Sequence, residues 1–444
     1  MTVMGTDSVT GSPLFAPGLP EQAPQQALTS VAVLGLGYVG LPTSIGLAEQ
    51  GMRVIGVDVS ERRLQDVSEG SVDLADPERE RLRSAVELGG LTLTSDPGAL
   101  QAADAVVICV PTPVDENFAP DLRFIRGACN TVVEQARRDQ VIVLTSTTYV
   151  GTTRELLIQP LAERGLRAGR EVFVAFSPER IDPGNRRFTQ EDTPRVVGGA
   201  TSECARSAAA IVGGVAARVH VVSSPETAEM TKLYENTFRA VNIAFANEMA
   251  GASRSYGLDP VEITRAAATK PYGFMAFQPG PGVGGHCIPC DPHYLLEGLR
   301  GRRGYAPVTE RAMKSIAMRP TAVVCRALEV LAEQGVRAGE ARVLVVGAAY
   351  KPGVRDVREA PAVRIMRELA HDGVGVSYHD PLVRSLEADE NLALLSVPRP
   401  HPADYDLALL VTVHHGHDYA WLDDFDHVLD CTYETPLGRK RALI

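Results

Sequence analysis

The chain has 444 residues, a length that predicts two to three domains rather than one. Hydrophobic residues make up 45% and charged residues 22% of it, which is ordinary for a soluble globular protein. The formal net charge of -11 argues against broad binding to nucleic acids or acidic membranes, so neither is expected as a partner. A small anionic substrate stays compatible with this charge, because it needs only a local basic pocket.

Seven cysteines are scattered along the chain, an odd number that makes a disulfide framework unexpected. No apolar run approaches the length of a membrane span. No basic residue precedes Arg53, so neither a secretory signal nor an Arg-rich transit peptide is expected. These features predict a cytoplasmic protein. Residues 1–28 contain four prolines with Gly, Ser and Gln between them, a composition typical of a disordered leader.

Residues 29–58 follow the order strand, G-x-G-x-x-G, helix, strand, acid. Gly35 would permit the tight turn, Gly37 the close approach of a pyrophosphate, and Gly40 close packing of the helix on the strand. Asp58 would accept hydrogen bonds from the adenosine ribose hydroxyls, and its charge would repel a 2′-phosphate. The pattern therefore predicts a dinucleotide site that favours NAD over NADP. The alternative is a Gly-rich turn in some other α/β unit.

Three more buried strands follow, each with polar residues after it. The predicted strands are Ala105–Val110, Val141–Leu144 and Glu171–Phe176. Strands separated by helices predict a parallel sheet, with ligands at the carboxyl ends of the strands. Thr112, Thr147 and Glu179 lie at those ends and are candidate site residues on position alone. Each threonine could instead be a helix N-cap.

A long helix is predicted to begin at Ser224-Pro225, with Ser as N-cap and Pro in the first turn, and to end at Gly257. A helix of this length often spans domains or forms a dimer interface. Lys232 and Asn236 are four residues apart and share one face of it. They are either site residues or a solvated lysine and an ordinary helical asparagine.

Residues 279–294, PGPGVGGHCIPCDPHY, hold the candidate nucleophile, Cys287. Glycine-rich backbone before it can pass close to a ligand. His286 beside the thiol and Asp291 four residues later favour an activated cysteine.

Cys290 completes a C-x-x-C sequence with Cys287. A reversible disulfide that switches off the nucleophile is one hypothesis. A zinc knuckle would need a second Cys or His pair at finger spacing, which is absent, so no metal site is expected. The third interpretation is that Cys290 packs as a small apolar group.

The C-terminal part restarts an α/β pattern. Its predicted elements are the strands Arg342–Val346, Val374–Tyr378, Leu407–Thr412 and Val428–Leu429 and the helix Pro361–Ala370. Gly347 follows the first of these strands, but the full glycine fingerprint is missing. This pattern predicts a second nucleotide-binding-like domain that is less suited to a dinucleotide.

Six motifs, in order, resemble the nucleotide-sugar 6-dehydrogenase family, the UDP-glucose/GDP-mannose dehydrogenases, over about residues 29–435. They are VLGLGYVGLP, STTYVGTT, FSPERIDPGN, KLYENTFRAVNIAFANE, PGPGVGGHCIP-DP-Y and GAAYKPGVRDVREAP. The resemblance implies an α/β fold in which two Rossmann-like, doubly wound domains are joined by a helical central domain with a long connecting helix. The implied domains are 29–205 for NAD, 206–320 for dimerisation and the catalytic Lys and Cys, and 321–444 for the UDP-sugar. A homodimer is the implied assembly.

The sequence around the nucleophile bears on the sugar. Members acting on UDP-glucose or GDP-mannose tend to carry G-G-S-C, whereas this chain has G-G-H-C at 284–287 together with PERIDPGN. This combination is similar to the branch that oxidises UDP-N-acetylhexosamines, UDP-GlcNAc or UDP-ManNAc. The implied reaction is an NAD-dependent four-electron oxidation of the C6 hydroxyl to a uronic acid, through a thiohemiacetal and a thioester on Cys287.

The resemblance also implies roles for individual residues. Lys232 and Asn236 would stabilise the oxyanion, Asp291 would position water and support Lys232, and Thr147 and Glu179 would handle water and hydrolysis. The implied cofactor contacts are Gly35, Gly37, Tyr38, Val39, Gly40, Asp58, Arg63, Thr112 and Thr147. The implied substrate contacts are Glu179, Arg180, Lys232, Asn236, Gly284, Lys351 and Arg358.

Three other functions stay open. A UDP-glucose 6-dehydrogenase would use the same machinery on a different sugar. A dehydrogenase of the β-hydroxyacid type also joins a Rossmann domain to a helical Lys/Asn site, but it needs neither Cys287 nor the segment 347–358. A non-catalytic sensor of NAD or nucleotide sugar would bind without turnover, and the intact set of candidate catalytic residues argues against it.

Overall fold

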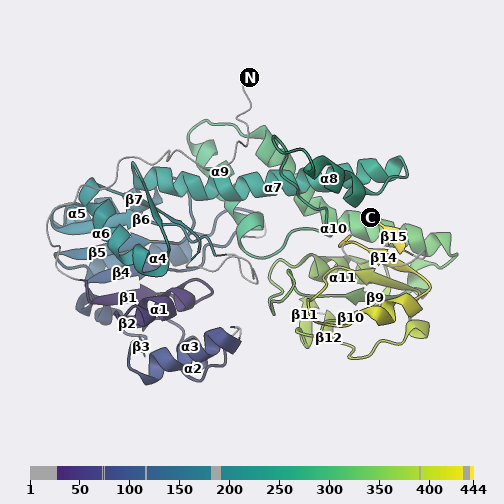
Figure 1. The fold of residues 1–444 in the computed structure, drawn as a ribbon, viewed down its shortest axis with the longest axis horizontal. Helices are drawn as coiled ribbons and strands as arrows, with labels where there is room; N and C mark the ends of the chain where they lie inside the picture. The colour runs from purple at the N-terminus through teal and green to yellow at the C-terminus, as the bar shows by residue number, and fades with distance from the viewer. Residues whose placement is uncertain are drawn as a thin grey trace. The chain divides into compact units, whose positions relative to one another are not determined.

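The structure is a computed structural model and describes residues 28–72, 74, 76–115, 118–181, 192–389, 392–433 and 441–444. The chain divides into two compact units (Figure 1). The N-terminal unit contains Pro17–Glu235 and His293–Gly304, and the C-terminal unit contains chiefly Asn236–Pro292 and Tyr305–Ile444. The predicted leader, 1–28, lies outside the described residues except for Leu28, and so does the end of the PERIDPGN string, beyond Ile181.

The N-terminal unit is built on an eight-stranded sheet in the order β3-β2-β1-β4-β5-β6-β7-β8. Neighbouring strands pair in parallel, except that β6 and β7 are antiparallel. The strands are β1 Ser30–Leu34, β2 Arg53–Val57, β3 Leu91–Thr94, β4 Ala105–Ile108, β5 Gln140–Leu144, β6 Val172–Phe176, β7 Arg195–Gly199 and β8 Val219–Val222. The helices are α1 Gly40–Glu49, α2 Glu61–Ser68, α3 Asp76–Glu87, α4 Arg123–Gln135, α5 Gln159–Glu163 and α6 Ser202–Val212, with shorter turns η1 Pro97–Ala102, η2 Arg154–Ile158 and η3 Gly213–Val215.

Alternate residues of each strand face opposite layers of helices, as the two-residue period of a strand requires. In β1, Val31 and Val33 join a core that includes side chains of α1 and α6. Ala32 and Leu34 join a second core that includes side chains of α4 and α5. Because both faces are covered, the central strands are apolar throughout, which is why they were recognisable in the sequence.

The C-terminal unit contains a parallel sheet in the order β10-β9-β13-β14-β15 and a separate β11–β12 hairpin. The strands are β9 Arg342–Val346, β10 Gly375–His379, β11 Ser385–Asp389, β12 Leu392–Leu395, β13 Leu407–Leu410, β14 Val428–Asp430 and β15 Arg441–Leu443. The helices are α8 Pro260–Ala268, α10 Pro307–Glu333 and α11 Pro361–His371, with shorter turns η4 Ala338–Glu340, η5 Pro402–Asp404 and η6 Ala420–Asp424.

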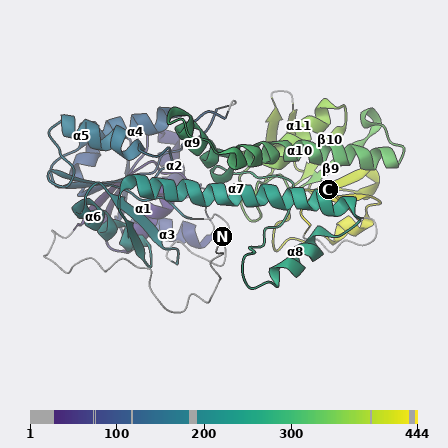
Figure 2. The ribbon, with the colours of Figure 1, turned by 90° about the horizontal axis from the view of Figure 1, so that it is seen from above.

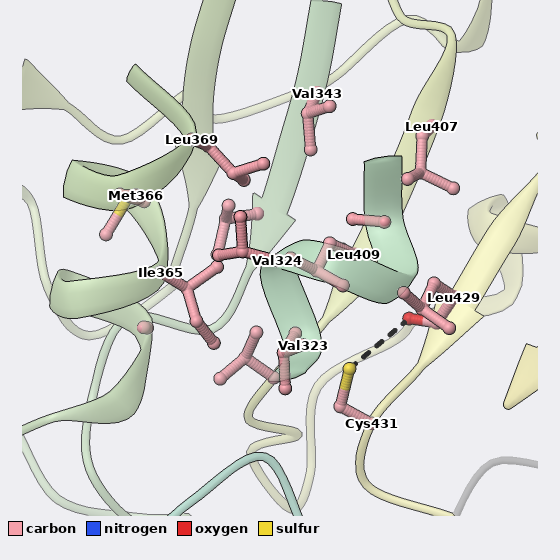
Figure 3. Close-up of a cluster of buried hydrophobic side chains, with 14 of the residues drawn as sticks. Val323, Val324, Val343, Ile365, Met366, Leu369, Leu407, Leu409, Leu429 and Cys431 are labelled. Atoms are coloured by element: carbon pink, nitrogen blue, oxygen red, sulfur yellow. Dashed lines mark hydrogen bonds between the residues drawn. The ribbon is translucent and has the colours of Figure 1, made fainter. Parts of the chain in front are cut away.

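The core of this sheet repeats the layered plan. Val343 of β9 and Leu409 of β13 pack with Val324 of α10 and Ile365 of α11 (Figure 3). Leu344 and the other alternate residues face η6 instead. Two layered α/β units confirm the predicted fold class.

Two helices contribute residues to both units: α7 Pro225–Ser255 and α9 Cys287–Gly301. The long helix α7 is unbroken (Figure 2), and its start agrees with the prediction, since the Thr227 N–H donates to Ser224 Oγ at 3.2 Å. Within the C-terminal unit, Ala244 of α7, Ile288 of α9 and Met313 of α10 share a small apolar cluster. Across the described ranges, no helix is long and apolar enough to cross a membrane.

The turn from β1 into α1 contains two glycines with no room for a side chain. Gly35 has a φ of +93°, and its N–H donates to the Val57 carbonyl oxygen at 2.8 Å. A Cβ on Gly35 would lie 2.5 Å from the Cys109 carbonyl oxygen, and a Cβ on Gly40 would lie 1.8 Å from the Gly35 carbonyl oxygen. Gly37 differs, because a Cβ there would meet nothing within 4 Å. The turn is therefore closely packed around Gly35 and Gly40 and open beside Gly37.

A buried carboxylate on α7 holds the loop that follows β5. Glu229 accepts hydrogen bonds from the Gly151 N–H at 2.6 Å, from the Thr153 N–H at 2.8 Å and from the Thr153 hydroxyl at 2.6 Å. Burial raises the pKa of this carboxyl, although the three hydrogen bonds act in the opposite direction. The donors lie just before η2, so Glu229 serves this turn as an N-cap supplied by a distant helix.

The two kinds of glycine predict opposite outcomes of substitution by alanine. Gly40→Ala forces a Cβ against backbone, and we expect it to destabilise the protein by about 3 kcal/mol or more. Gly37→Ala adds a methyl group to open space, and we expect a stability change below about 0.5 kcal/mol with weaker NAD binding. Differential scanning calorimetry and NAD titration measure both effects. Equal melting temperatures for the two variants would contradict this description of the turn.

Glu229→Ala should loosen the loop after β5 much more than Glu226→Ala. The first variant leaves two backbone N–H groups without their buried acceptor, a loss of about 1–3 kcal/mol. Glu226 lies on the same helix and pairs with Arg154 at 2.6 Å in a partly exposed salt bridge, for which we expect about 1 kcal/mol or less. Hydrogen exchange at the Thr153 amide is the measurement. If protection of the Thr153 amide from hydrogen exchange fell equally in both variants, the capping role of Glu229 would be disproved.

Candidate active site

Four predicted site residues follow the carboxyl ends of neighbouring parallel strands. Asp58 follows β2, Thr112 follows β4, Thr147 follows β5 and Glu179 follows β6. These strands and β1 are adjacent in the order β2-β1-β4-β5-β6, so the four residues and the glycine turn lie along one edge of the sheet. Thr112 and Glu179 are buried, and Thr147 is half-buried. The structure thus brings these predicted residues to the edge where α/β sheets bind ligands.

The half-buried carboxylate of Asp58 is tied to the glycine turn. Its Oδ2 accepts the Leu36 N–H at 2.9 Å, and its Oδ1 accepts the Ser60 N–H at 2.9 Å. Arg63 donates through Nε to the Leu36 carbonyl oxygen at 2.8 Å, which closes the turn from the other side. Tyr38 is exposed in the same turn. The turn, its acid and Arg63 therefore form one connected structure.

Glu179 is held in a buried ion pair. Its Oε1 accepts the N–H groups of Arg180 at 2.7 Å and Ile181 at 2.9 Å, and its Oε2 lies 2.5 Å from a guanidinium nitrogen of Arg195. Both side chains of the pair are buried, so the cation compensates the carboxylate charge where water cannot. Arg195 belongs to β7, a strand that was not predicted from the sequence. Its hydrogen-bonding role was missed for that reason.

The end of α7 that belongs to the N-terminal unit carries Lys232. This lysine is only 7% exposed, so the alternative of a solvated lysine does not describe it. Glu235, one turn along, forms an ion pair with Arg180. Arg180 also donates to the Pro194 carbonyl oxygen at 2.8 Å. Arg180 is thus anchored between α7 and the segment before β7.

In the C-terminal unit, Cys287 is the first residue of α9 and its side chain is exposed. The N-terminus of a helix favours a thiolate, because the helix dipole stabilises negative charge there. One turn along, Asp291 is buried and accepts a hydrogen bond from the buried amide nitrogen of Asn236 on α7. The predicted asparagine and acid therefore meet directly, beside the start of the helix that presents the thiol.

Cys290 is also in the first turns of α9, but it is buried. All seven cysteines are thiols in the structure. In the ranges that the structure describes, no group of three or more His, Cys, Asp or Glu side chains could hold a metal ion.

The glycines before Cys287 lie against the segment after β9. A Cβ on Gly284 would lie 2.7 Å from Tyr350 Cβ, and a Cβ on Gly285 would lie 2.7 Å from the Tyr350 ring. The Gly285 N–H donates to the Arg358 carbonyl oxygen at 3.0 Å. The Arg358 side chain is half-exposed and pairs with Asp356 at 2.7 Å. Arg358, one of the predicted substrate residues, is thus a neighbour of the nucleophile loop within one unit.

His286, between Gly285 and Cys287, is largely enclosed. Its Nε2 is buried and has no hydrogen-bond partner among the described residues. Burial and the nearby Arg358 charge lower the pKa of this imidazole, so it is neutral at pH 7. A neutral histidine does not repel the cations of the predicted substrate site.

The predicted residues divide between the two units. Lys232, Glu179 and the glycine turn belong to the N-terminal unit, whereas Cys287 and Asn236 belong to the other. A direct encounter of Lys232 with the thiol therefore stays a prediction. Two residues that hold the site, Arg195 and Glu229, were not predicted from the sequence. Glu229 could have been found, because it precedes Lys232 by three residues on one helix face.

Three models of one family match the sequence. The NAD binding domain of the UDP-glucose/GDP-mannose dehydrogenase family matches residues 29–216, its central domain matches 226–315, and its UDP binding domain matches 344–434.

Relatives with known names agree with this match. A UDP-N-acetyl-D-mannosamine dehydrogenase of Pyrococcus horikoshii is 34% identical over 357 residues, 80% of this chain and 84% of that protein. A UDP-N-acetyl-D-glucosamine 6-dehydrogenase of Pseudomonas aeruginosa is 33% identical over 388 residues, 86% of this chain and 90% of that protein. The solved structure of a UDP-D-ManNAc dehydrogenase from Pyrococcus horikoshii has a TM-score of 0.85 at 30% identity, covering 94% of this chain and 99% of that one.

The cofactor of the family fits the residues present here. The glycine turn leaves open space beside Gly37 and places the Asp58 carboxylate next to it, as the adenosine half of NAD requires. The motif resemblance is confirmed by matches that span most of the chain. The protein is an NAD-dependent nucleotide-sugar dehydrogenase and belongs to the UDP-glucose/GDP-mannose dehydrogenase family.

Proposed function

We propose that the chain oxidises the C6 hydroxyl of a UDP-N-acetylhexosamine, UDP-GlcNAc or UDP-ManNAc, to the uronic acid through covalent intermediates on Cys287. The observation that carries the proposal is the exposed Cys287 at the start of α9, with the buried Asn236–Asp291 pair one turn along. The names of the two relatives support an acetamido sugar. The G-G-H-C sequence around the nucleophile agrees with them.

Gly35, Gly37 and Asp58 would hold NAD, together with Arg63 and Thr112. Bound NAD supplies the acceptor for two electrons at each of the two oxidation steps. The residues of the chain then have to bind the sugar, trap the aldehyde and direct water.

The Cys287 sulfur would bond to the C6 carbonyl carbon, which leaves negative charge on the carbonyl oxygen. Lys232 and Asn236 would stabilise this charge, because both are buried donors and act more strongly away from water. Asp291 fixes the orientation of the Asn236 amide by accepting its N–H. Oxidation of the thiohemiacetal gives a thioester, which is labile to water.

Thr147 and Glu179 would direct the hydrolytic water. Glu179 is anchored by Arg195 and by two backbone N–H groups, so it suits the orientation of water at a fixed place. Lys351, Arg358, Arg180 and Gly284 would bind the nucleotide sugar, the cations through its phosphates.

We also propose the domain division 29–205, 206–320 and 321–444, and a homodimer. On α7, Phe238, Phe245 and Met249 are exposed large apolar residues, which a second copy would cover. A reactive thiol at position 287 favours a reducing compartment, which agrees with a cytoplasmic location.

The expected activity is NADH formation at 340 nm with UDP-GlcNAc or UDP-ManNAc, close to two NADH per sugar. We expect Cys287→Ser to lose the second oxidation and form no acid, because an alcohol is a far weaker nucleophile than a thiolate and does not trap the aldehyde. UDP-glucose and GDP-mannose are the comparison substrates, and Cys325→Ser, at an exposed cysteine, is the matched control that should keep full activity.

Turnover on UDP-glucose alone would keep the mechanism and refute the acetamido assignment. Tight NAD binding without turnover on any of the four sugars would favour a sensor. One NADH per sugar, with the aldehyde as product, would refute the thioester.

The C-x-x-C sequence adds a redox prediction. Hydrogen peroxide can take two electrons and two protons from Cys287 and Cys290, giving a disulfide and water. We expect activity to fall under mild peroxide and to return with dithiothreitol, and Cys290→Ser to lose this recovery cycle. A Cys290→Ser enzyme that is inactivated and rescued like the wild type would disprove the disulfide.

A further inference from the structure

The first turn of the C-terminal sheet repeats the geometry of the first turn of the N-terminal sheet. The Gly347 N–H donates to the His379 carbonyl oxygen at 2.8 Å, as the Gly35 N–H donates to Val57. A Cβ on Gly347 would lie 2.1 Å from the Thr412 carbonyl oxygen, so only glycine fits there as well. The acid that follows the second strand is Asp380, the counterpart of Asp58.

The two acids differ in what their oxygens do. Asp58 is half-buried and accepts two backbone N–H groups. Asp380 is only 2% exposed and has five donors. They are the N–H groups of Ala348 at 2.7 Å, Ala349 at 3.1 Å, Leu382 at 2.8 Å and Val383 at 2.9 Å, and the Nε2–H of His414 at 3.1 Å. Asp380 is therefore saturated by the protein itself and has no oxygen left for a ribose.

His414 links this acid to the segment that follows β9. Its ring is 1% exposed; Nε2 faces Asp380 and Nδ1 accepts the Gly353 N–H at 3.0 Å. A ring that accepts at Nδ1 donates at Nε2, which fixes the neutral tautomer. Burial opposes ionisation of Asp380, but the His414 hydrogen bond and the backbone N–H groups lower its pKa. The carboxylate and the imidazole thus form a clamp on Ala348, Ala349 and Gly353.

The clamped segment leads directly to the nucleophile loop. Tyr350 donates its N–H to the Asp356 carbonyl oxygen at 2.9 Å, and Asp356 in turn pairs with Arg358. The Arg358 carbonyl oxygen accepts the Gly285 N–H, two residues before Cys287. The segment 348–358 therefore lies between the clamp and the loop that carries the thiol.

We propose that His414 and Asp380 are positioning residues that hold segment 348–358 in the shape that binds the UDP part of the substrate and supports the Cys287 loop. This rests on the proposed function, because UDP is the ligand considered. In the N-terminal sheet the Asp58 carboxylate can still accept hydrogen bonds from a cofactor, whereas in the C-terminal sheet the Asp380 carboxylate supports segment 348–358. A sheet of the same type thereby becomes a site for UDP rather than for a dinucleotide.

The test compares His414→Leu, which removes both hydrogen bonds, with His414→Gln, whose amide can still donate to Asp380. His415→Ala, at an exposed neighbour, is the matched control. Calorimetric titration with UDP should show about tenfold weaker binding for His414→Leu, the loss of one to two hydrogen bonds, and a smaller loss for His414→Gln. NAD affinity should be unchanged in all three variants.

A second readout is the rate at which iodoacetamide alkylates Cys287, which should change in His414→Leu and not in His415→Ala. The positioning role would be disproved if wild-type protein and His414→Leu bound UDP with the same affinity and Cys287 were alkylated at the same rate in both. If wild-type protein does not bind UDP, the proposed function is refuted. The alkylation rates of Cys287 then test, independently of UDP, whether His414 and Asp380 position the loop. A merely structural role would lower the melting temperature and weaken NAD and UDP binding alike.

Discussion

A carboxylate that accepts backbone N–H groups of a turn organises the ligand edge of both units. Where a parallel strand ends and the chain turns over the sheet edge, backbone donors lose their strand partners and have to be satisfied. Asp58 does this for Leu36, and Asp380 does it for Ala348 and Ala349. The glycines at 35 and 347 are the other half of the arrangement, because a Cβ there would overlap the backbone of Cys109, just after β4, and of Thr412, just after β13.

The same arrangement serves different ligands because the acids are buried to different degrees. A half-buried carboxylate can share its charge with a ribose, whereas a carboxylate with five internal donors cannot accept more. We propose that the ligand of each unit depends on whether its acid has an oxygen left to accept a hydrogen bond, which in the C-terminal unit is prevented by four backbone N–H groups together with His414. Fold alone would have assigned a dinucleotide to both.

Features of the sequence that act over short distances were predictable. The glycine turn, its acid and α7 follow from patterns within about thirty residues, and the structure contains all of them. The pairs Glu179–Arg195 and Asp380–His414 were not predicted. Each joins residues from two different strands or the segments after them, and such a contact produces no repeating pattern in the sequence. Likewise, C-x-x-C spacing could not show that Cys287 is exposed while Cys290 is buried. Ile288 of the same helix packs with Ala244 of α7 and Met313 of α10, contacts between segments far apart in the sequence that spacing alone does not reveal.

The position of Cys287 follows from these long-range contacts. A helix start can favour a thiolate wherever it lies, but catalysis also requires the sulfur at a fixed place. Gly284 and Gly285 lie so close to Tyr350 that a larger residue would displace either the nucleophile loop or the segment after β9. The position of the loop is therefore coupled to that segment through these close contacts. A contact that orders one of them, whether the His414 clamp or a bound nucleotide, also orders the thiol.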